Sequence, residues 1–216
     1  MGRKKNLGQR VLIIKLAYQM FLEDGYDKVT TKQIAEQCNM AHSLLHYYYP
    51  TKQDLLVDII NTMGAKLYSY VVKEGVELTD KLFVFGLCQR VFFEVLSMNQ
   101  KLIGIYRPVF SDGLVLQRVT KYMVEKVGVF PEDAPEKALL SPYLFAGSMG
   151  QTLLLYTDFE LKMEFKEAIN IALDILYGAN GITKAGIHAK IGTIDMRGTQ
   201  AFVRGFLNEF TEMMYQ

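Results

Sequence analysis

The chain has 216 residues, and half of them are hydrophobic, including thirteen Phe and thirteen Tyr. It is long and apolar enough to bury a sizeable core, which excludes a disordered or low-complexity protein. The net charge of +1 excludes a protein coated by nucleic acid, but the charges are unevenly spread. Residues 1–52 hold eight basic and four acidic side chains, whereas the rest holds sixteen basic and nineteen acidic ones. A basic head on a slightly acidic body is typical of a protein that contacts phosphate through its head alone.

Cysteine usage and the N-terminus predict a cytoplasmic chain. The two cysteines, Cys38 and Cys88, lie far apart and lack the spacing of metal ligands, so we expect reduced thiols. The N-terminus is charged but lacks the apolar core of a signal peptide. Residues 139–156 are the run most similar to a membrane span, yet they include Pro142 and Gln151 and are barely long enough. We therefore expect a buried helix there and no membrane partner.

Three helices are predicted in the head. The first ends at Gly25, because apolar side chains recur before it at helical spacing and glycine is a common helix stop. Thr30 is a good N-cap for the second helix, and Gln33 completes a capping box with it. Asn39 can adopt the left-handed conformation that ends this helix, and the third helix stops at Pro50. Two short helices joined by a tight turn match a helix-turn-helix, whose second helix enters the DNA major groove.

A fourth helix is predicted from Lys52 to the mid-70s, with Thr51 as its cap and an apolar stripe along its length. It starts beside the second short helix of the helix-turn-helix. No linker rich in Pro, Gly or Ser interrupts it. Because the helix is continuous, we expect it to transmit movement in the body directly to the head.

The rest of the chain also has helical spacing. A deeply buried helix is expected over 80–98, which is apolar nearly all round, and a shorter one over 99–110 that Pro108 interrupts. Further helices are expected over 114–127, 134–159, 164–177 and 194–214. Gly178 should end the third of these. No strand alternation or internal repeat is present, so the predicted architecture is all-α.

The outer face of the second short helix carries side chains that can read DNA. Leu45 and Tyr49 lie four residues apart and should face inward, which turns the other side chains toward solvent. Imidazole and hydroxyl groups hydrogen-bond base edges, and Tyr rings also contact thymine methyl groups. Core packing is the alternative for Tyr48 and Tyr49, and a metal pair is the alternative for the two histidines, although no third ligand is in view. The outward-facing candidates are His42, Ser43, His46 and Tyr47.

Several residues between positions 10 and 56 stand at the spacing of a known family. They are Phe21, Gly25, Tyr26, residues 30–35, residues 45–52 and residues 54–56. With them the chain resembles the tetracycline-repressor (TetR) family of bacterial transcriptional regulators. The resemblance implies a three-helix helix-turn-helix DNA-binding domain at 1–52 and a C-terminal helical ligand-binding and dimerisation domain at 53–216. It also implies contacts to DNA from Thr31, Lys32, Tyr48 and Lys52.

Three positions depart from the family pattern. Ala41 stands where a capping Ser or Thr is usual, which costs about 1 kcal/mol of helix stability. Leu44 stands where a small polar residue is common, and His46 replaces a frequent Tyr. We expect these changes to alter which operator is read rather than whether DNA is read.

The body offers aromatic and sulfur-bearing side chains for an effector cavity, which the TetR resemblance implies. The candidate lining residues are Cys88, Phe92, Tyr106, Met123, Tyr143 and Met149. Such a lining favours a largely apolar ligand with one or two polar anchors, and ordinary core packing is the alternative for each residue. Gly147, Ser148 and Gly150, together with a ladder of Phe near the C-terminus, indicate a homodimer face or tight packing within one chain.

The sequence offers no basis for catalysis, a metal site or a cofactor, because the GxSxG, GxGxxG and HExxH motifs are absent. We therefore predict a DNA-binding transcriptional regulator, most simply a repressor. Its homodimer would bind a double-stranded, near-palindromic operator and be released by a small lipophilic effector. One alternative is a DNA-binding protein of this fold with an architectural or partner-controlled role and no effector. The other is a helical carrier or scaffold with a vestigial head.

Overall fold

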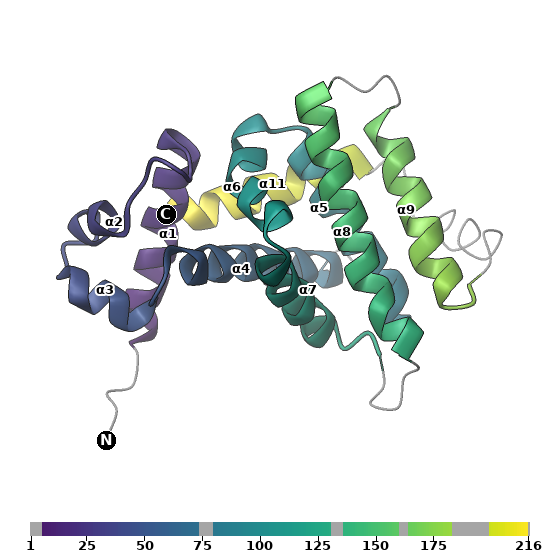
Figure 1. Ribbon diagram of the computed structural model, residues 1–216, viewed down its shortest axis with the longest axis horizontal. Helices are drawn as coiled ribbons and strands as arrows, with labels where there is room; N and C mark the ends of the chain where they lie inside the picture. Colours follow the sequence, from purple (N-terminus) through teal and green to yellow (C-terminus); the bar gives the residue numbers. More distant parts are fainter. Residues whose placement is uncertain (1–5, 74–79, 131–135, 160–163, 183–198, 216) are drawn as a thin grey trace.

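The computed structural model describes residues 6–73, 80–130, 136–159, 164–182 and 199–215 (Figure 1). All regular structure within these ranges is helical, so the prediction of an all-α fold is confirmed. The head contains α1 (Leu7–Asp24), α2 (Thr31–Gln37) and α3 (His42–Tyr48). The body contains α5 (Lys81–Ser97), α6 (Gln100–Ser111), α7 (Gly113–Val127), α8 (Glu136–Phe159), α9 (Phe165–Ala179) and α11 (Thr199–Tyr215), and α4 (Lys52–Lys73) belongs to both.

The local signals in the head form as the sequence predicts. The Thr30 hydroxyl accepts from the backbone N–H of Gln33, and the Gln33 side chain accepts from the backbone N–H of Thr30, which completes the capping box. Asn39 has a φ of 52°, so it adopts the left-handed conformation that ends α2. Gly25, with a φ of 92°, ends α1. These contacts fix the angle at which α3 leaves α2.

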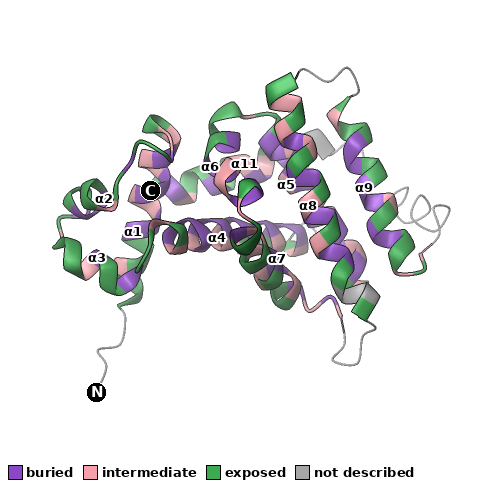
Figure 2. Cartoon of the chain, in the orientation of Figure 1, coloured by how far each residue is buried: buried purple, intermediate pink, exposed green. Residues whose placement is uncertain are grey.

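Helix α4 runs without a break from the head into the body (Figure 1). Its buried residues extend along the whole helix, from Leu55 to Val71 (Figure 2). It packs against α1 at one end and against α5, α7 and α11 further along. The continuous helix that the sequence predicts is therefore present. Any shift of α4 must change its contacts with both the head and the body.

The core is continuous between head and body. One cluster of buried side chains extends from Ile13 in α1 to Met214 in α11. The Tyr18 ring meets the Phe210 ring edge to face at 5.4 Å, and the Gln19 side chain donates to the carbonyl oxygen of Met214 at 2.7 Å. The division at residues 52 and 53 remains a prediction, and the head rests on the last helix as well as on α4.

Two expectations about the helices of the body are wrong. Pro108 does not interrupt α6, which continues to Ser111. The side chains of Val109 and Phe110, which follow Pro108, are buried in the core and hold the last turn of the helix in place. Gly178 does not end α9, which reaches Ala179. The left-handed turn that follows is taken by a later glycine. The residues expected to open the last helix before Thr199 lie outside the described ranges.

Two rings of the aromatic ladder of the last helix pack within this chain. Phe206 and Phe210 are buried within the chain, stacked on each other at 5.9 Å. Tyr70 and Tyr18 contact them from α4 and α1. The helical spacing was read correctly, but it marks the side that packs on this chain's own core. Among the described helices, α8 included, none is long and apolar enough to cross a membrane.

Candidate nucleic-acid interface and internal cavity

The outer face of α3 carries the four side chains that the sequence places there. Leu45 and Tyr49 are buried and fix the inner face of this segment. The outer side chains are therefore set by the packing of α3 against α2. The exposed residues are His42, Ser43, His46 and Tyr47.

Hydrogen bonds and ring contacts order the two histidines on this face. Nε2 of His42 lies 3.0 Å from Oγ1 of Thr31, which joins α3 to the first turn of α2. The rings of His42 and His46 meet edge to face with centroids 4.4 Å apart. Nδ1 of His46 lies 3.1 Å from the carbonyl oxygen of Pro50. The exposed imidazoles are therefore held in place by contacts within the head.

Tyr48 is buried and lies where α3 meets the start of α1. Its hydroxyl accepts from the backbone N–H of Asn6 at 2.9 Å and donates to Oε1 of Gln9 at 2.7 Å. Its ring meets that of Tyr47 edge to face at 5.6 Å. Tyr48 therefore orients the chain entering α1 and the exposed Tyr47 next to it, which the sequence alone did not indicate.

Lys52 turns its charge toward the head rather than outward. The ammonium donates to the carbonyl oxygen of Tyr26 and lies 4.0 Å from the centroid of the Tyr26 ring. Partial burial lowers the pKa of Lys52, an effect that nearby Asp27 opposes. Lys52 thus holds the turn after α1 against the start of α4. Lys32, by contrast, is exposed, and Thr31 is half-buried.

One carboxylate, Asp58 on α4, joins three elements of the head. It accepts from both Nε and Nη2 of Arg10 on α1, the former at 2.8 Å, and from the hydroxyl of Tyr49 after α3. The bond to Asp58 raises the pKa of Arg10 above its ordinary value. Sequence analysis missed this junction. The available signal was an acidic residue inside the apolar run of α4.

A second set of polar contacts ties the first turn of α4 to the start of α7. Asp54 accepts from the backbone N–H of Thr51 at 3.0 Å and from Nη2 of Arg118 at 2.8 Å. Gln53 donates to Asp112, the N-cap of α7, at 3.2 Å. Burial raises the pKa of Asp54, but the bonds from Thr51 and Arg118 outweigh it and hold the pKa below its ordinary value. The end of α4 nearest α3 is therefore held to the body.

A cavity of about 40 Å³ lies among α4, α5, α6, α7 and α8. Of the six predicted lining residues, four contact it: Cys88, Phe92, Tyr106 and Met123. Tyr143 and Met149 do not, because α8 turns Ala146 toward the cavity instead. Besides Ala146, the rest of the lining consists of Ile60, Gly64, Leu67, Gln89, Phe93, Val109, Phe110, Leu116, Val119 and Thr120.

The chemistry of this lining is apolar, aromatic and sulfur-rich. The Tyr106 hydroxyl donates to Sδ of Met63 at 2.8 Å, and burial raises the pKa of Tyr106 well above its ordinary value. Of the described residues that line the cavity, none carries a formal charge. Gln89 supplies an amide group to the lining, and Thr120 supplies an aliphatic hydroxyl group. A buried water needs roughly 10–15 Å³ on this scale, so the cavity holds a few waters at most.

Met123 packs against a glycine on α4 and so limits the cavity. A Cβ built on Gly64 would lie 2.2 Å from Sδ of Met123, so the thioether occupies the space that a side chain would need. Thioether side chains are flexible and adapt to irregular space. The Met123 thioether is therefore an adaptable part of the lining where α7 meets α4.

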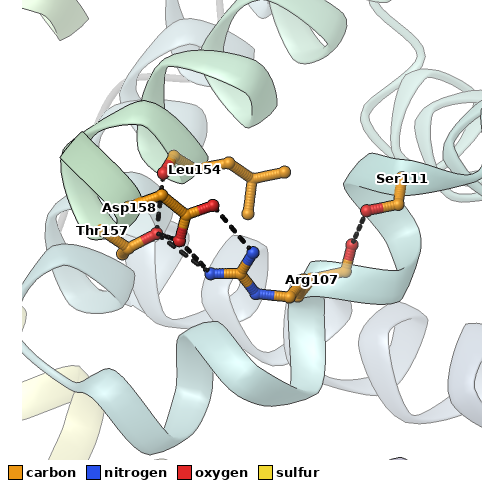
Figure 3. A network of polar contacts seen from close by, with 5 residues as sticks. All are labelled: Arg107, Ser111, Leu154, Thr157 and Asp158. Carbon is orange, nitrogen blue, oxygen red and sulfur yellow. Dashed lines mark hydrogen bonds and ion pairs between the residues drawn. The ribbon is translucent and has the colours of Figure 1, made fainter.

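A polar network outside the cavity holds α6 to α8 (Figure 3). Arg107 donates to both carboxylate oxygens of Asp158, at 3.0 and 2.6 Å, and to Oγ1 of Thr157 at 3.2 Å. Thr157 in turn donates to the carbonyl oxygen of Leu154, and Ser111 donates to that of Arg107. Because Arg107 and Asp158 are about half exposed, solvent screens this pair and it contributes little to stability.

Comparison with known proteins identifies the head. Residues 13–59 match the profile of the family described as bacterial regulatory proteins, tetR family. This match contains the helix-turn-helix and the start of α4, the elements whose geometry is described above. Over these residues the chain is similar to the DNA-binding region of the TetR family.

Two curated relatives share this region. The chain is 28% identical over 61 residues to YuxN, an uncharacterized HTH-type transcriptional regulator of Bacillus subtilis (strain 168), covering 28% of this chain. It is 20% identical over 112 residues, half of this chain, to the HTH-type transcriptional regulator QacR of Staphylococcus aureus (strain Mu50 / ATCC 700699). The chain spans 21% of the length of YuxN and 60% of that of QacR.

A solved TetR-family structure has the same fold beyond the head. FadR of Thermus thermophilus, a transcriptional repressor crystallised with lauroyl-CoA, aligns with a TM-score of 0.58 at 17% identity. The alignment covers 79% of this chain and 94% of that one. At this identity the likeness establishes the fold alone, including the helical C-terminal region expected for a TetR protein.

The departures from the TetR pattern are visible in the structure. Ala41 leaves α3 without a side-chain cap, as its residue type predicts. The hydrogen bond between Thr31 and His42 joins the first residue of α3 to α2, although no side chain caps α3. Leu44 is half-buried and packs on the core, so it is turned away from the fully exposed face. His46, the third departure, stays at the centre of the exposed face.

Proposed function

We propose that this TetR-family chain is a transcriptional repressor that a small, uncharged, largely apolar ligand releases from its operator. One observation carries the proposal: α4 starts beside α3 and also lines the cavity through Ile60, Gly64 and Leu67. A ligand in the cavity therefore touches the helix that positions the DNA-reading face.

The exposed face of α3 would read the operator. His42, Ser43, His46 and Tyr47 are available for base edges in the major groove. Lys32, on the neighbouring α2, would contact phosphate together with Thr31. Tyr48 and Lys52, whose polar groups are engaged inside the head, would act by holding α1, α3 and α4 in register. In this proposal residues 1–52 form the DNA-binding part and residues 53–216 the ligand-binding and dimerisation part.

The effector would be uncharged and contain a ring. The described lining offers aromatic faces, thioether and thiol sulfur, one amide and one aliphatic hydroxyl, without a cation or an acid. The lauroyl-CoA bound by Thermus FadR contains phosphate groups, and such groups need basic partners that this lining lacks. A neutral aromatic compound with one hydrogen-bonding group fits the lining better.

Coupling would run through the contact of α7 with α4. A ligand that fills the cavity must displace Met123 from Gly64, which moves α7 relative to α4. Arg118 and Asp112, at the start of α7, hold Asp54 and Gln53 in the first turn of α4. Movement of α7 therefore pulls on the end of α4 next to α3. A coupling of about 1–3 kcal/mol would weaken operator binding roughly five- to 150-fold.

Two copies of the chain would act together on a near-palindromic operator in the cytoplasm. α8 and α9 lie side by side at the end of the molecule away from the head (Figure 1). Their outer sides expose a stripe of large apolar residues, which is unusual for a monomer and suits a symmetric partner. The stripe consists of Leu140, Leu144, Leu155 and Phe159 on α8 and Ile171 and Ile175 on α9.

The proposal is tested in two steps. Gel-shift titration of DNA upstream of the chain's own gene, at moderate salt, should give a fragment that competes better than bulk DNA. A thermal-shift screen of neutral aromatic compounds should then give a stabilising compound that releases this fragment. A sequence-specific complex that no compound releases would leave an architectural DNA-binding protein, and absence of any preferred fragment would contradict the regulator function.

A further inference from the structure

The ring of His46 is fixed in one tautomer by the backbone. Its Nδ1 lies 3.1 Å from the carbonyl oxygen of Pro50, and a carbonyl oxygen can only accept a hydrogen bond. The proton of the neutral ring is therefore on Nδ1, and Nε2 has a free lone pair. The side chain is exposed, and the structure records no partner for its Nε2 within the described part of the chain.

His42 supports this orientation from the preceding turn. Its ring meets that of His46 edge to face at 4.4 Å, and its own Nε2 is held by Oγ1 of Thr31 at 3.0 Å. The His46 ring is thus held by Pro50 on the C-terminal side and by His42 on the N-terminal side. A side chain that is already ordered loses little entropy when it binds, which favours a specific contact.

We propose that His46 is a specificity-determining residue that accepts a hydrogen bond, through Nε2, from the amino group of an adenine or a cytosine. The inference rests on the proposed function, because it requires α3 to lie in the major groove. There the base donors are N6 of adenine and N4 of cytosine. Guanine presents the acceptors N7 and O6, and thymine presents the acceptor O4. The lone pairs of these atoms would face the lone pair of Nε2, so His46 would disfavour both bases.

The test is selection from a randomised duplex library of roughly 20 base pairs. One position in each half-site should prefer adenine or cytosine over guanine and thymine by on the order of tenfold.

Variants locate the effect at one side chain. His46→Phe keeps an aromatic ring without nitrogen and should lose the preference at that position. His46→Gln, which can both donate and accept, should bind with a weaker preference there. Glu209→Ala, on α11 and outside the α3 face, is the control and should keep the preference. The proposal is overturned if the wild type selects guanine or thymine at that position, or if the preference for adenine or cytosine persists in His46→Phe. Failure of the proposed function would look different, because no sequence would then be enriched.

Discussion

The head and the cavity region of this protein are held together by different kinds of contact. In the head, directional hydrogen bonds fix the geometry: Asp58 joins Arg10 to Tyr49, and Tyr48 joins Asn6 to Gln9. Around the cavity, the contacts are apolar and involve flexible groups, as where Met123 packs on Gly64.

The difference suits the proposed function, in which the head reads DNA and the cavity region adapts to a ligand. Hydrogen bonds weaken steeply when their geometry changes, so the α3 face keeps its shape. Thioether contacts have little directional preference and can rearrange at lower cost. Helix α4 belongs to both regions, and Asp54 with Arg118 ties its first turn to the cavity side. Substitutions in each region, and in the link between them, test this difference.

Asp58→Ala should damage the head most. The substitution leaves Arg10 and Tyr49 without their acceptor, so we expect a loss of about 2–3 kcal/mol in the free energy of unfolding, measured with urea. The matched control is Glu209→Ala, which removes an exposed partner of Lys73 and should cost at most about 0.5 kcal/mol. Equal losses in the two variants would contradict the role of Asp58 as the junction of three elements.

Gly64→Ala should have a smaller effect on stability and a distinct effect on function. The added methyl group pushes Met123 away from α4, which we expect to cost about 1–2 kcal/mol and to weaken operator binding as a ligand does. Gly104→Ala is the control, because a Cβ there meets no atom within 4 Å. It should stabilise the helix by about 0.5–1 kcal/mol. Unchanged operator affinity in Gly64→Ala would show that α7 and α4 move independently.

Arg118→Ala tests the link between the two regions. The pair with Asp54 is partly exposed, so the loss of stability should be about 0.5 kcal/mol. The release of operator by ligand should nevertheless become weaker, because α7 no longer holds the first turn of α4. Arg107→Ala, which removes a similar pair between α6 and α8, serves as the control and should leave the release intact. Competition binding with and without ligand measures both variants.

The smallest expected effect is a pH dependence of stability. The folded pKa of Asp54 is held below its ordinary value of 3.8, so its charged form contributes stability at pH values above about 4. That contribution should be lost as the pH falls through the lowered pKa. Urea unfolding of the wild type and Asp54→Asn between about pH 3 and pH 6 measures it. A difference between the two that does not shrink at low pH would contradict the assignment.

Much of the head could be predicted from sequence because its signals are local. The capping box of Thr30 and Gln33, the left-handed Asn39 and the inward Leu45 each depend on neighbours within a few residues. The junction at Asp58 could not be found in this way, because Arg10 is 48 residues away. Periodicity indicates which face of a helix is buried, not which helix covers it.

The same limit explains the outcome for the cavity. Aromatic and sulfur-bearing residues on α5, α6 and α7 were identified by type, and Cys88, Phe92, Tyr106 and Met123 do meet. Sequence analysis did not identify the role of Gly64. This glycine matters because the Met123 side chain packs against it from another helix, and the sequence does not show which helices are neighbours. Tyr143 was expected in the lining, but the rotation of α8 places it outside.

The central claim is that a ligand in the cavity and the operator at α3 oppose each other through α4. Calorimetry of a stabilising neutral aromatic compound, titrated into the free protein and into the protein–operator complex, tests this most directly. The account predicts that operator weakens ligand binding by the same factor, roughly five- to 150-fold, by which the ligand weakens operator binding. Equal ligand affinity for the free and DNA-bound protein would contradict it.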